Sequence, residues 1–189
     1  MAVDPLAVFR QWFDEAHEAG VEVPEAMTLA TADADGRPSA RMLLLKSADE
    51  RGFTFFTGYE SRKGRELARN PRAALVFYWR PLGKQVRVEG TVRRLSAEES
   101  DAYWATRPER SRAAAAASRQ SEPIESREEL EAEFERRLAL GEVPRPERWG
   151  GYVLEPDAIE LWRHRDDRLH ERTRFTRARD GWRAEHLAP

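Results

Sequence analysis

Short strand-like segments separated by tight turns constrain the fold of this chain most strongly. The segments that read as strands lie at residues 27–32, 39–47, 53–57, 73–79, 85–95, 152–154, 159–164, 171–177 and 182–186. Turn-forming residues such as Asp35-Gly36 separate several of them. The unbroken apolar run Met42–Leu45 predicts burial on both faces, as in a barrel. The pattern favours an α+β, mainly β domain built on an antiparallel barrel, and it lacks the alternating strand and helix units of a doubly wound sheet.

Helices are predicted between and beside these strands, at residues 5–19, 61–70, 96–107, 111–118 and 126–141. Ser96 and Ser126 each stand three residues before a glutamate, which is the spacing of a capping box. Pro108 disfavours the helical conformation at Arg107 and argues against one continuous helix there. We expect a single domain over residues 1–189, with an N-terminal helical segment at 1–25 and closing strands within 150–189.

Composition excludes several classes of protein. The chain has 189 residues, a net charge of −2 and no cysteine, so disulfides and thiolate metal sites are ruled out. Near neutrality gives no general attraction to nucleic acid or to a membrane surface. No signal peptide, no membrane-length apolar run, no dinucleotide fingerprint and no P-loop motif is present. Four histidines without a zinc-like spacing predict no metal site, and the chain reads as cytoplasmic.

One basic constellation combines Arg41–Lys46 with Ser61-Arg62-Lys63. Arg62 and Lys63 fall in the first turn of a predicted helix, where the helix dipole disfavours cations. A phosphate docked at that N-terminus would account for them. The alternative is an ordinary basic surface turn.

Two further groups are weaker. Tyr103, Arg107 and Ser111 are spaced by four and would share one helix face, where they would suit a phosphate monoester. A surface helix end is the alternative. Gln120 and Ser121 follow an alanine-rich stretch and could bond a heterocycle or a phosphate, although a solvated helix end explains them as well.

The segment from Trp162 to Arg172 is the richest in potentially functional side chains. Read as an extended strand, it places Arg168, His170 and Arg172 on one face. Three potential cations side by side repel one another unless an anion lies among them, so an anionic ligand is predicted. Trp162 reads as a core residue, with stacking on a flat ligand as the alternative.

Taken together, these motifs resemble the pyridoxine/pyridoxamine 5′-phosphate oxidase family, from about Asp4 to the terminal Pro189. The resemblance is carried by Arg41–Lys46, Ser61-Arg62-Lys63, Asn70-Pro71-Arg72, Gln85-Val86, Arg107-Pro108, Ser118–Ser121, Trp149-Gly150-Gly151 and Arg168–Arg172. Each motif alone is weak, whereas all of them in this order are specific.

The resemblance implies an FMN-binding split β-barrel and a homodimer with FMN at the subunit interface. It implies that the strands within 150–189 complete the active site. The implied FMN contacts are Arg41, Met42, Leu43, Leu44, Leu45, Lys46, Phe56, Thr57, Arg62, Lys63, Gln85, Gln120, Ser121, Trp162 and Arg172.

The resemblance also implies the reaction. Pyridoxamine 5′-phosphate or pyridoxine 5′-phosphate would lose a hydride from C4′ to the flavin, and O2 would reoxidise the flavin to give H2O2. The implied substrate contacts are Lys46, Tyr103, Arg107, Ser111, Arg168 and His170. Arg168 and His170 are the implied catalytic pair, with positioning and electrostatic roles.

The chain departs from the family pattern at three places. Phe56 and Glu171 stand where the family often has Tyr and Asp. Flavin oxidases of phenazine biosynthesis can also carry Glu at the second position, so they remain an alternative. A non-catalytic flavin-binding or haem-binding protein of the same fold is a third possibility. Longer family members also carry a basic N-terminal arm that approaches the substrate. From the sequence we expect no such arm here, so the resemblance does not say how the site would close over the substrate.

Overall fold

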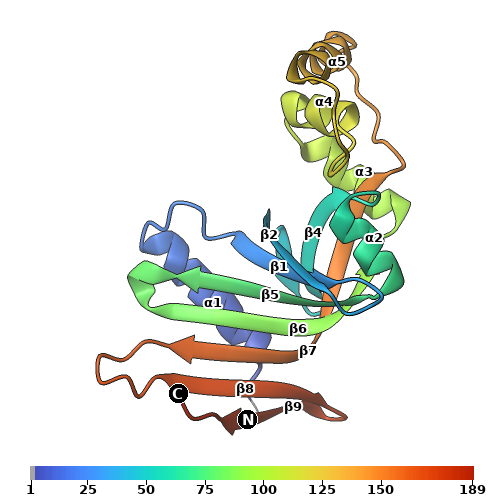
Figure 1. Ribbon diagram of the computed structural model, residues 1–189. Helices are drawn as coiled ribbons and strands as arrows, with labels where there is room; N and C mark the ends of the chain where they lie inside the picture. The colour runs from blue at the N-terminus through green and yellow to red at the C-terminus, as the bar shows by residue number, and fades with distance from the viewer. Residues whose placement is uncertain (1–2) are drawn as a thin grey trace.

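One antiparallel sheet forms the body of the molecule in the computed structural model, which describes residues 3–189 (Figure 1). The path of hydrogen-bonded neighbours is β2-β1-β5-β6-β7-β4-β3, and β8 and β9 continue the sheet beyond β7. The strands are β1 (Ala26–Ala32), β2 (Pro38–Leu44), β3 (Ser47–Asp49), β4 (Gly52–Gly58), β5 (Arg72–Trp79), β6 (Lys84–Arg94), β7 (Trp149–Arg163), β8 (Glu171–Ala178) and β9 (Gly181–His186). The predicted mainly β architecture is confirmed, and β3 is a strand that the sequence pattern missed.

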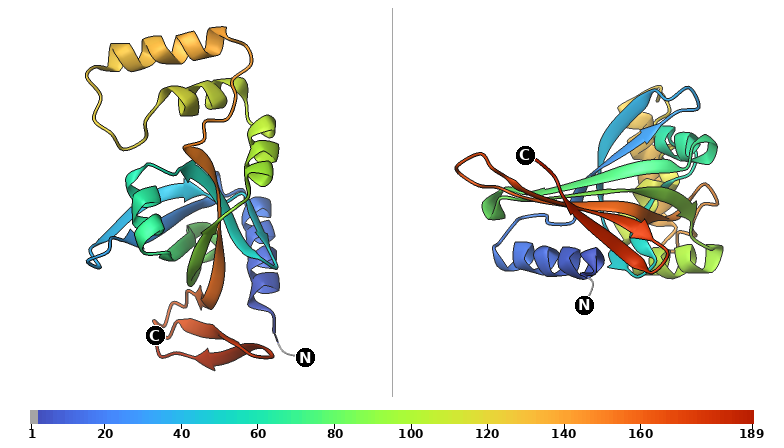
Figure 2. Two further views of the ribbon diagram at one scale, coloured as in Figure 1. Left: turned by 90° about the vertical axis from the view of Figure 1, so that its right-hand side faces the viewer. Right: turned by 90° about the horizontal axis from the view of Figure 1, so that it is seen from below.

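Helices flank the sheet at two places (Figure 2). They are α1 (Pro5–Glu18), α2 (Arg62–Arg69), the single 3-10 turn η1 (Arg80–Leu82), α3 (Ala97–Thr106), α4 (Glu109–Ala117) and α5 (Arg127–Ala139). Helix α1 covers one face of the sheet, whereas α4 and α5 project from its far end. Within residues 3–189, none of the helices has both the length and the apolar character needed to cross a bilayer.

Strand β7 is one continuous strand, so the prediction of two separate strands at 152–154 and 159–164 was wrong. Proline cannot donate to a strand ladder, so a proline within a central strand needs a special place. Pro156 instead lies opposite Gly90, at a register shift in β6 between Glu89 and Gly90. A side chain at Gly90 would come within 2.1 Å of the Glu155 carbonyl oxygen, so only glycine lets the two backbones approach this closely.

Strand β2 is not buried on both faces, which corrects the barrel-like prediction for Met42–Leu45. It pairs only with β1 and lies at the edge of the sheet. Its side chains therefore alternate, with Met42 61% and Leu44 45% exposed while Leu43 packs against the core. Only Leu45, just past the strand end, is buried. The apolar run thus leaves an uncovered apolar edge on the single chain.

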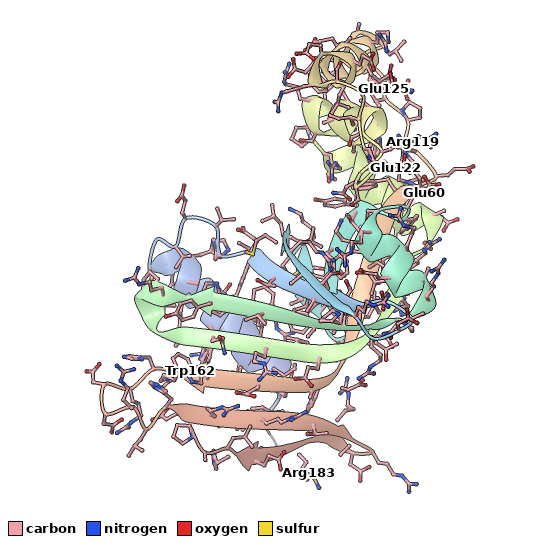
Figure 3. All side chains as sticks on the ribbon, viewed as in Figure 1. Glu60, Arg119, Glu122, Glu125, Trp162 and Arg183 are labelled. Atoms are coloured by element: carbon pink, nitrogen blue, oxygen red, sulfur yellow. The ribbon has the colours of Figure 1, made fainter. Side chains whose placement is uncertain are left out.

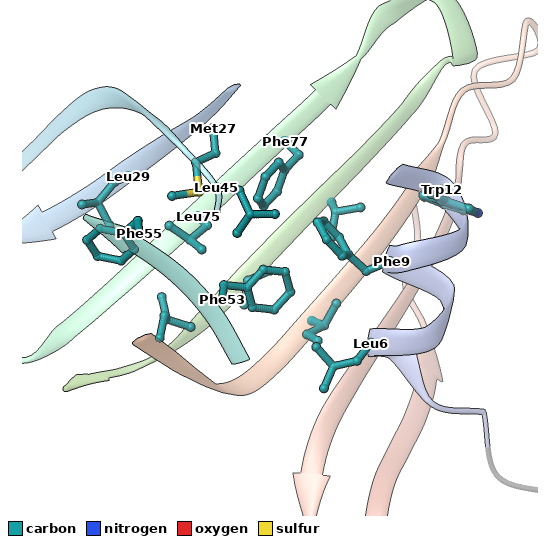
Figure 4. Packing of buried hydrophobic residues seen from close by; sticks show 14 of the residues in the cluster. Leu6, Phe9, Trp12, Met27, Leu29, Leu45, Phe53, Phe55, Leu75 and Phe77 are labelled. Carbon is teal, nitrogen blue, oxygen red and sulfur yellow. The ribbon is translucent and has the colours of Figure 1, made fainter. Parts of the chain in front are cut away.

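The main core lies between the sheet and α1 (Figure 4). Phe9 of α1 packs edge-on against Phe53 and Phe77, with ring centroids 4.8 and 5.0 Å apart. Asp4 caps the helix by accepting a hydrogen bond from the Leu6 amide at 3.1 Å, with proline in the first turn as predicted. This cap and this packing fix α1 on the sheet.

A second, smaller core attaches α3 and α4 to the end of β7. It contains Trp104, Ala113, Ala116, Val143 and Trp149. The Trp104 indole donates to the Val143 carbonyl at 2.8 Å, which satisfies the one polar atom of the side chain. Helices α3 and α4, which carry Tyr103 and Ser111 and flank Arg107, are therefore held rigidly against the sheet.

We expect Phe9→Ala to lower the free energy of unfolding by about 3–5 kcal/mol, because it empties a fully buried ring site. Urea unfolding at fixed protein concentration measures this loss. Val23→Ala, at a position that is 45% exposed, is the control and should change stability by less than about 0.5 kcal/mol. Equal stabilities for the two variants would contradict the assignment of Phe9 to the core.

Candidate active site

A buried ammonium group marks the junction of β4, α2 and the loop after α4. Lys63 is only 5% exposed, and its Nζ donates to Thr57 Oγ1, Ser61 Oγ and Gln120 Oε1 at 3.1, 3.2 and 3.0 Å. All three partners are neutral. Burial, reinforced by the charge of Arg41, lowers the pKa of Lys63 to about 8. A buried cation without an ion-pair partner among residues 3–189 is suited to binding an anion.

A carboxylate organises the arginines beside this ammonium group. Glu66 accepts hydrogen bonds from Thr31 Oγ1 and Ser39 Oγ at 2.5 and 2.7 Å, and forms ion pairs with Arg41 and Arg62 at 3.3 and 2.9 Å. We call these five residues the Glu66 network. The hydroxyl and guanidinium donors overcome the opposing effect of burial and lower the pKa of Glu66 to about 2.

A first cleft of about 270 Å³ opens next to Lys63. Its polar lining includes Thr57, Ser61, Gln120, Arg119 and Arg148. The labelled side chains Glu60, Arg119 and Glu122 lie together where the sheet meets α3 and α4 (Figure 3). Gln120 lines this cleft, and Ser121 follows it with a left-handed φ of 73°. Thr57, Ser61 and Gln120, the three neutral partners of Lys63, therefore all line this cleft.

A second cleft of about 420 Å³ adjoins the first. It is lined by Met42, Leu43, Leu44, Lys46, Phe56, Tyr103, Arg107, Pro108 and Ser111. The four residues of the expected phosphate set thus line one space: Lys46 follows β2, Tyr103 lies on α3, Arg107 lies between α3 and α4, and Ser111 lies on α4. Leu43, Phe56 and Arg107 line both clefts, so the two spaces share a wall.

Arg107 forms the polar part of the shared wall. The predicted interruption at Pro108 is confirmed, because α3 ends before Arg107 and α4 begins after Pro108. The guanidinium lies 4.7 Å over the Trp149 ring, and its Nη2 donates to the Ser111 carbonyl at 3.1 Å. Burial lowers the pKa of Arg107, and its Nε is buried without a hydrogen-bond partner. An arginine held flat on an aromatic face presents its remaining donors in a fixed direction.

The prediction that Arg168, His170 and Arg172 share one strand face was wrong. Strand β8 begins at Glu171, and residues 164–170 form a loop in which Arg168 has a left-handed φ of 66°. Asp167 stabilises this loop by accepting from the Leu169 amide at 2.9 Å. His170 Nδ1 accepts from the Arg165 amide at 3.1 Å, which leaves Nε2 as the donor of the neutral ring. Local side-chain to backbone bonds therefore replace the expected strand.

Three other predicted cofactor residues form a row across the sheet. Gln85, Trp162 and Arg172 are register partners on β6, β7 and β8. Trp162 is half-buried with its ring 4.7 Å from that of His170, so its predicted place in the core was wrong. Arg172 is held by the buried Glu160 at 2.8 Å and donates to the Ala188 carbonyl at 2.9 Å.

The predicted cofactor residues therefore fall into two groups within one chain. Trp162 lies at the opposite end of the sheet from Glu60 and Arg119 (Figure 3). The side chain of Leu45 packs in the core, so only its backbone is available to a ligand.

Some residues of the site were missed from the sequence. Arg148 lines the first cleft and donates to the Ala116 carbonyl at 2.5 Å, but no local pattern connects it to α4. Glu66 carried a usable signal, because it stands four residues after Arg62 on the same helix, which is the spacing of an ion pair. Glu160 gave no such signal, since its partners Arg87 and Arg172 lie on neighbouring strands.

Comparisons with known proteins agree with this geometry. A family model described as pyridoxamine 5′-phosphate oxidase matches residues 13–140. A model of the pyridoxine 5′-phosphate oxidase C-terminal dimerisation region matches residues 149–189.

Two relatives, both named pyridoxine/pyridoxamine 5′-phosphate oxidase, match over almost their whole length. The Rubrobacter xylanophilus protein is 58% identical, with 98% of this chain and 87% of the relative covered. The Salinibacter ruber protein is 53% identical, with 98% and 89% covered.

Two solved structures share the fold. PhzG from Burkholderia lata, in complex with tetrahydrophenazine-1-carboxylic acid, superposes with a TM-score of 0.97 at 40% identity and covers 100% of this chain and 94% of its own. A pyridoxamine 5′-phosphate oxidase-related, FMN-binding protein from Nostoc punctiforme has a TM-score of 0.80 at 19% identity, with 100% of both chains covered. The fold is the split barrel of these flavin proteins, and the chain belongs to the pyridoxamine 5′-phosphate oxidase family.

Proposed function

We propose that the protein is an FMN-dependent oxidase that converts pyridoxamine 5′-phosphate and pyridoxine 5′-phosphate to pyridoxal 5′-phosphate. O2 is the electron acceptor and H2O2 the second product. The observation that carries this proposal is the pair of adjoining clefts. One borders the buried ammonium of Lys63, and the other collects Lys46, Tyr103, Arg107 and Ser111. Two neighbouring anion sites suit a phosphorylated cofactor beside a phosphorylated substrate.

The residues around the first cleft fit FMN. Lys63, with neutral partners only, would gain an ion pair from the cofactor phosphate, and Arg41 and Arg62 are both paired with Glu66, three residues further along α2. Bound FMN would supply a two-electron acceptor for the hydride lost from C4′ of the substrate, and O2 would take the electrons on to H2O2. The residues of the chain would bind and orient FMN. Thr57 and Gln120, which are hydrogen-bonded to each other, would contact its phosphate end.

The second cleft would hold the substrate phosphate. The Lys46 ammonium, the Arg107 guanidinium and the hydroxyls of Tyr103 and Ser111 offer both charge and directed donors to phosphate oxygens. Phe56 stacks on Tyr103 with ring centroids 3.8 Å apart, which fixes the phenol at the cleft. The substrate would thus be anchored through its phosphate, beside the first cleft.

A homodimer would unite the two groups of cofactor residues. Trp162 and its register partner Arg172 belong to the segment that matches the dimerisation region, and Trp162 lies far from the first cleft of its own chain (Figure 3). A second copy could bring this row to the first cleft and cover the exposed Met42 and Leu44. In that assembly Arg168 and His170 would position the substrate ring, with His170 Nε2 as hydrogen-bond donor.

A phenazine-type flavin oxidase is the second candidate, because the PhzG structure superposes closely on this chain. Glu171, which kept this alternative open, is engaged by Arg163 and Arg165 at 3.8 and 3.5 Å on the surface. The cationic second cleft favours the phosphorylated substrate, since a phenazine precursor without phosphate does not need it. A non-catalytic flavin-binding protein would leave this cleft without a role.

Turnover assays separate these functions. We expect the purified protein to be yellow with bound FMN and to release H2O2 in equimolar amount with pyridoxal 5′-phosphate when given either B6 phosphate. A peroxide assay run in parallel with a reduced phenazine precursor is the comparison. Oxidation of that precursor alone would select the phenazine function, and flavin binding without any turnover would select the non-catalytic one.

Arg107→Ala should raise KM for pyridoxamine 5′-phosphate by about tenfold to a hundredfold, because a charge-assisted bond to the phosphate is lost. The value of kcat should change much less. Arg110→Ala is the matched control on the adjoining helix α4, where the guanidinium is exposed and lies over Phe134. Steady-state kinetics measure both, and an unchanged KM in Arg107→Ala would remove this residue from the substrate site.

The affinity for FMN should fall as pH rises above about 8. Lys63 has a lowered pKa of about 8 in the free protein, and a bound phosphate dianion would favour its charged form. Binding above this pKa therefore takes up a proton, and the affinity should drop by up to about tenfold per pH unit, while it stays level from pH 7 to 8. Flavin fluorescence titrations from pH 7 to 9.5 measure this. Lys63→Met should bind FMN more weakly and without this slope, and a wild-type protein with no slope would contradict the role of Lys63.

A further inference from the structure

We propose that Glu66 is a positioning residue that holds the Arg41 and Arg62 side chains as a pair directed at the phosphate of bound FMN. This inference rests on the proposed function, because it names a residue that acts on the cofactor site through two others.

The first observation is that one carboxylate joins three separate elements. Glu66 lies on α2, Arg41 and Ser39 on β2, and Thr31 on β1. The Oε2 atom accepts from Thr31, Ser39 and Arg41, whereas Oε1 accepts from Arg62 at 2.9 Å. Both oxygens are thus occupied, and each guanidinium is tied to its own oxygen.

The second observation is that this carboxylate stays ionised although it is buried. Its side chain is 6% exposed, and burial disfavours an unpaired carboxylate strongly. Glu66 is also the only acidic residue of α2, which otherwise carries four basic residues. A helix that needed only solubility would carry its acid on the exposed face, so the buried position points to a role in fixing the neighbouring cations.

The third observation is that the network adjoins the Lys63 site. The charges of both Arg41 and Glu66 act on the Lys63 ammonium, which bonds to three residues that line the first cleft. Arg41 is further restrained by its bonds from Nη1 to Thr31 Oγ1 at 2.6 Å and to the Leu29 carbonyl at 3.2 Å. Arg62 is the more exposed of the pair, and the bond to Glu66 is its one side-chain restraint among residues 3–189.

A role of Glu66 through its charge and a role through positioning predict opposite effects of its substitution on phosphate binding. If Glu66 acted only through its charge, its removal would leave three cations less compensated and would strengthen phosphate binding. If it acts by positioning, shortening it while keeping the charge would already weaken binding, because charge-assisted hydrogen bonds depend on geometry. Glu66→Asp and Glu66→Gln therefore separate the two effects.

The test is a fluorescence titration of the full-length apoprotein with FMN and, in parallel, with riboflavin, which lacks the phosphate. We expect Glu66→Asp and Glu66→Gln each to raise the Kd for FMN by about tenfold and to leave the Kd for riboflavin unchanged. Glu155→Asp and Glu155→Gln are the matched controls, since Glu155 forms an exposed ion pair with Arg93 elsewhere on the sheet. These controls should bind both flavins as the wild type does.

Each other outcome overturns the inference. Wild-type affinity of Glu66→Asp for FMN, or tighter binding by Glu66→Gln, would show that charge and not position matters. Equal weakening for FMN and riboflavin would show that Glu66 only supports the scaffold. A wild-type protein that binds neither flavin would overturn the proposed function itself, which is visible before any variant is compared.

Discussion

Strand β7 is the constraint on which the rest of the structure depends. It hydrogen-bonds to β6 along most of its length, to β4 through its first half and to β8 through its second half. Its first residue, Trp149, joins the small core beneath α3 and α4, and its far end carries Trp162. One strand therefore fixes both the two clefts and the distant row of residues at the other end of the sheet. The close approach of β6 and β7 at Gly90 is what keeps this strand unbroken.

Local sequence patterns predicted the elements well wherever the determining contacts are local. The caps at Asp4 and Ser96, the interruption at Pro108 and the short helix after Ser61 all depend on residues within four positions of one another. The patterns were wrong where a distant partner decides. Pro156 is tolerated in β7 because of Gly90 on another strand, and Met42 is exposed because β2 has only one neighbour.

The site follows the same rule. Periodicity placed Tyr103, Arg107 and Ser111 near one another, but only the fold brings Lys46 of a distant segment into the same cleft. The segment Trp162–Arg172 near the end of the chain is dense in charged side chains, and its alternation predicted a strand. Its strand reading was wrong, because Asp167 and the His170 ring bond to nearby backbone amides and hold a loop instead. Spacing could not divide these residues between cofactor and substrate, and the division that we propose comes from the family resemblance.

The shared wall between the two clefts has a consequence for how this scaffold can diverge. Leu43, Phe56 and Arg107 border both spaces, so a substitution at any of them alters both clefts at once. A substitution at these positions that reshapes one cleft also changes the lining of the other. Of these two clefts, Lys46, Tyr103 and Ser111 border only the second. Substitutions at these three residues can therefore reshape the second cleft while the first keeps its lining.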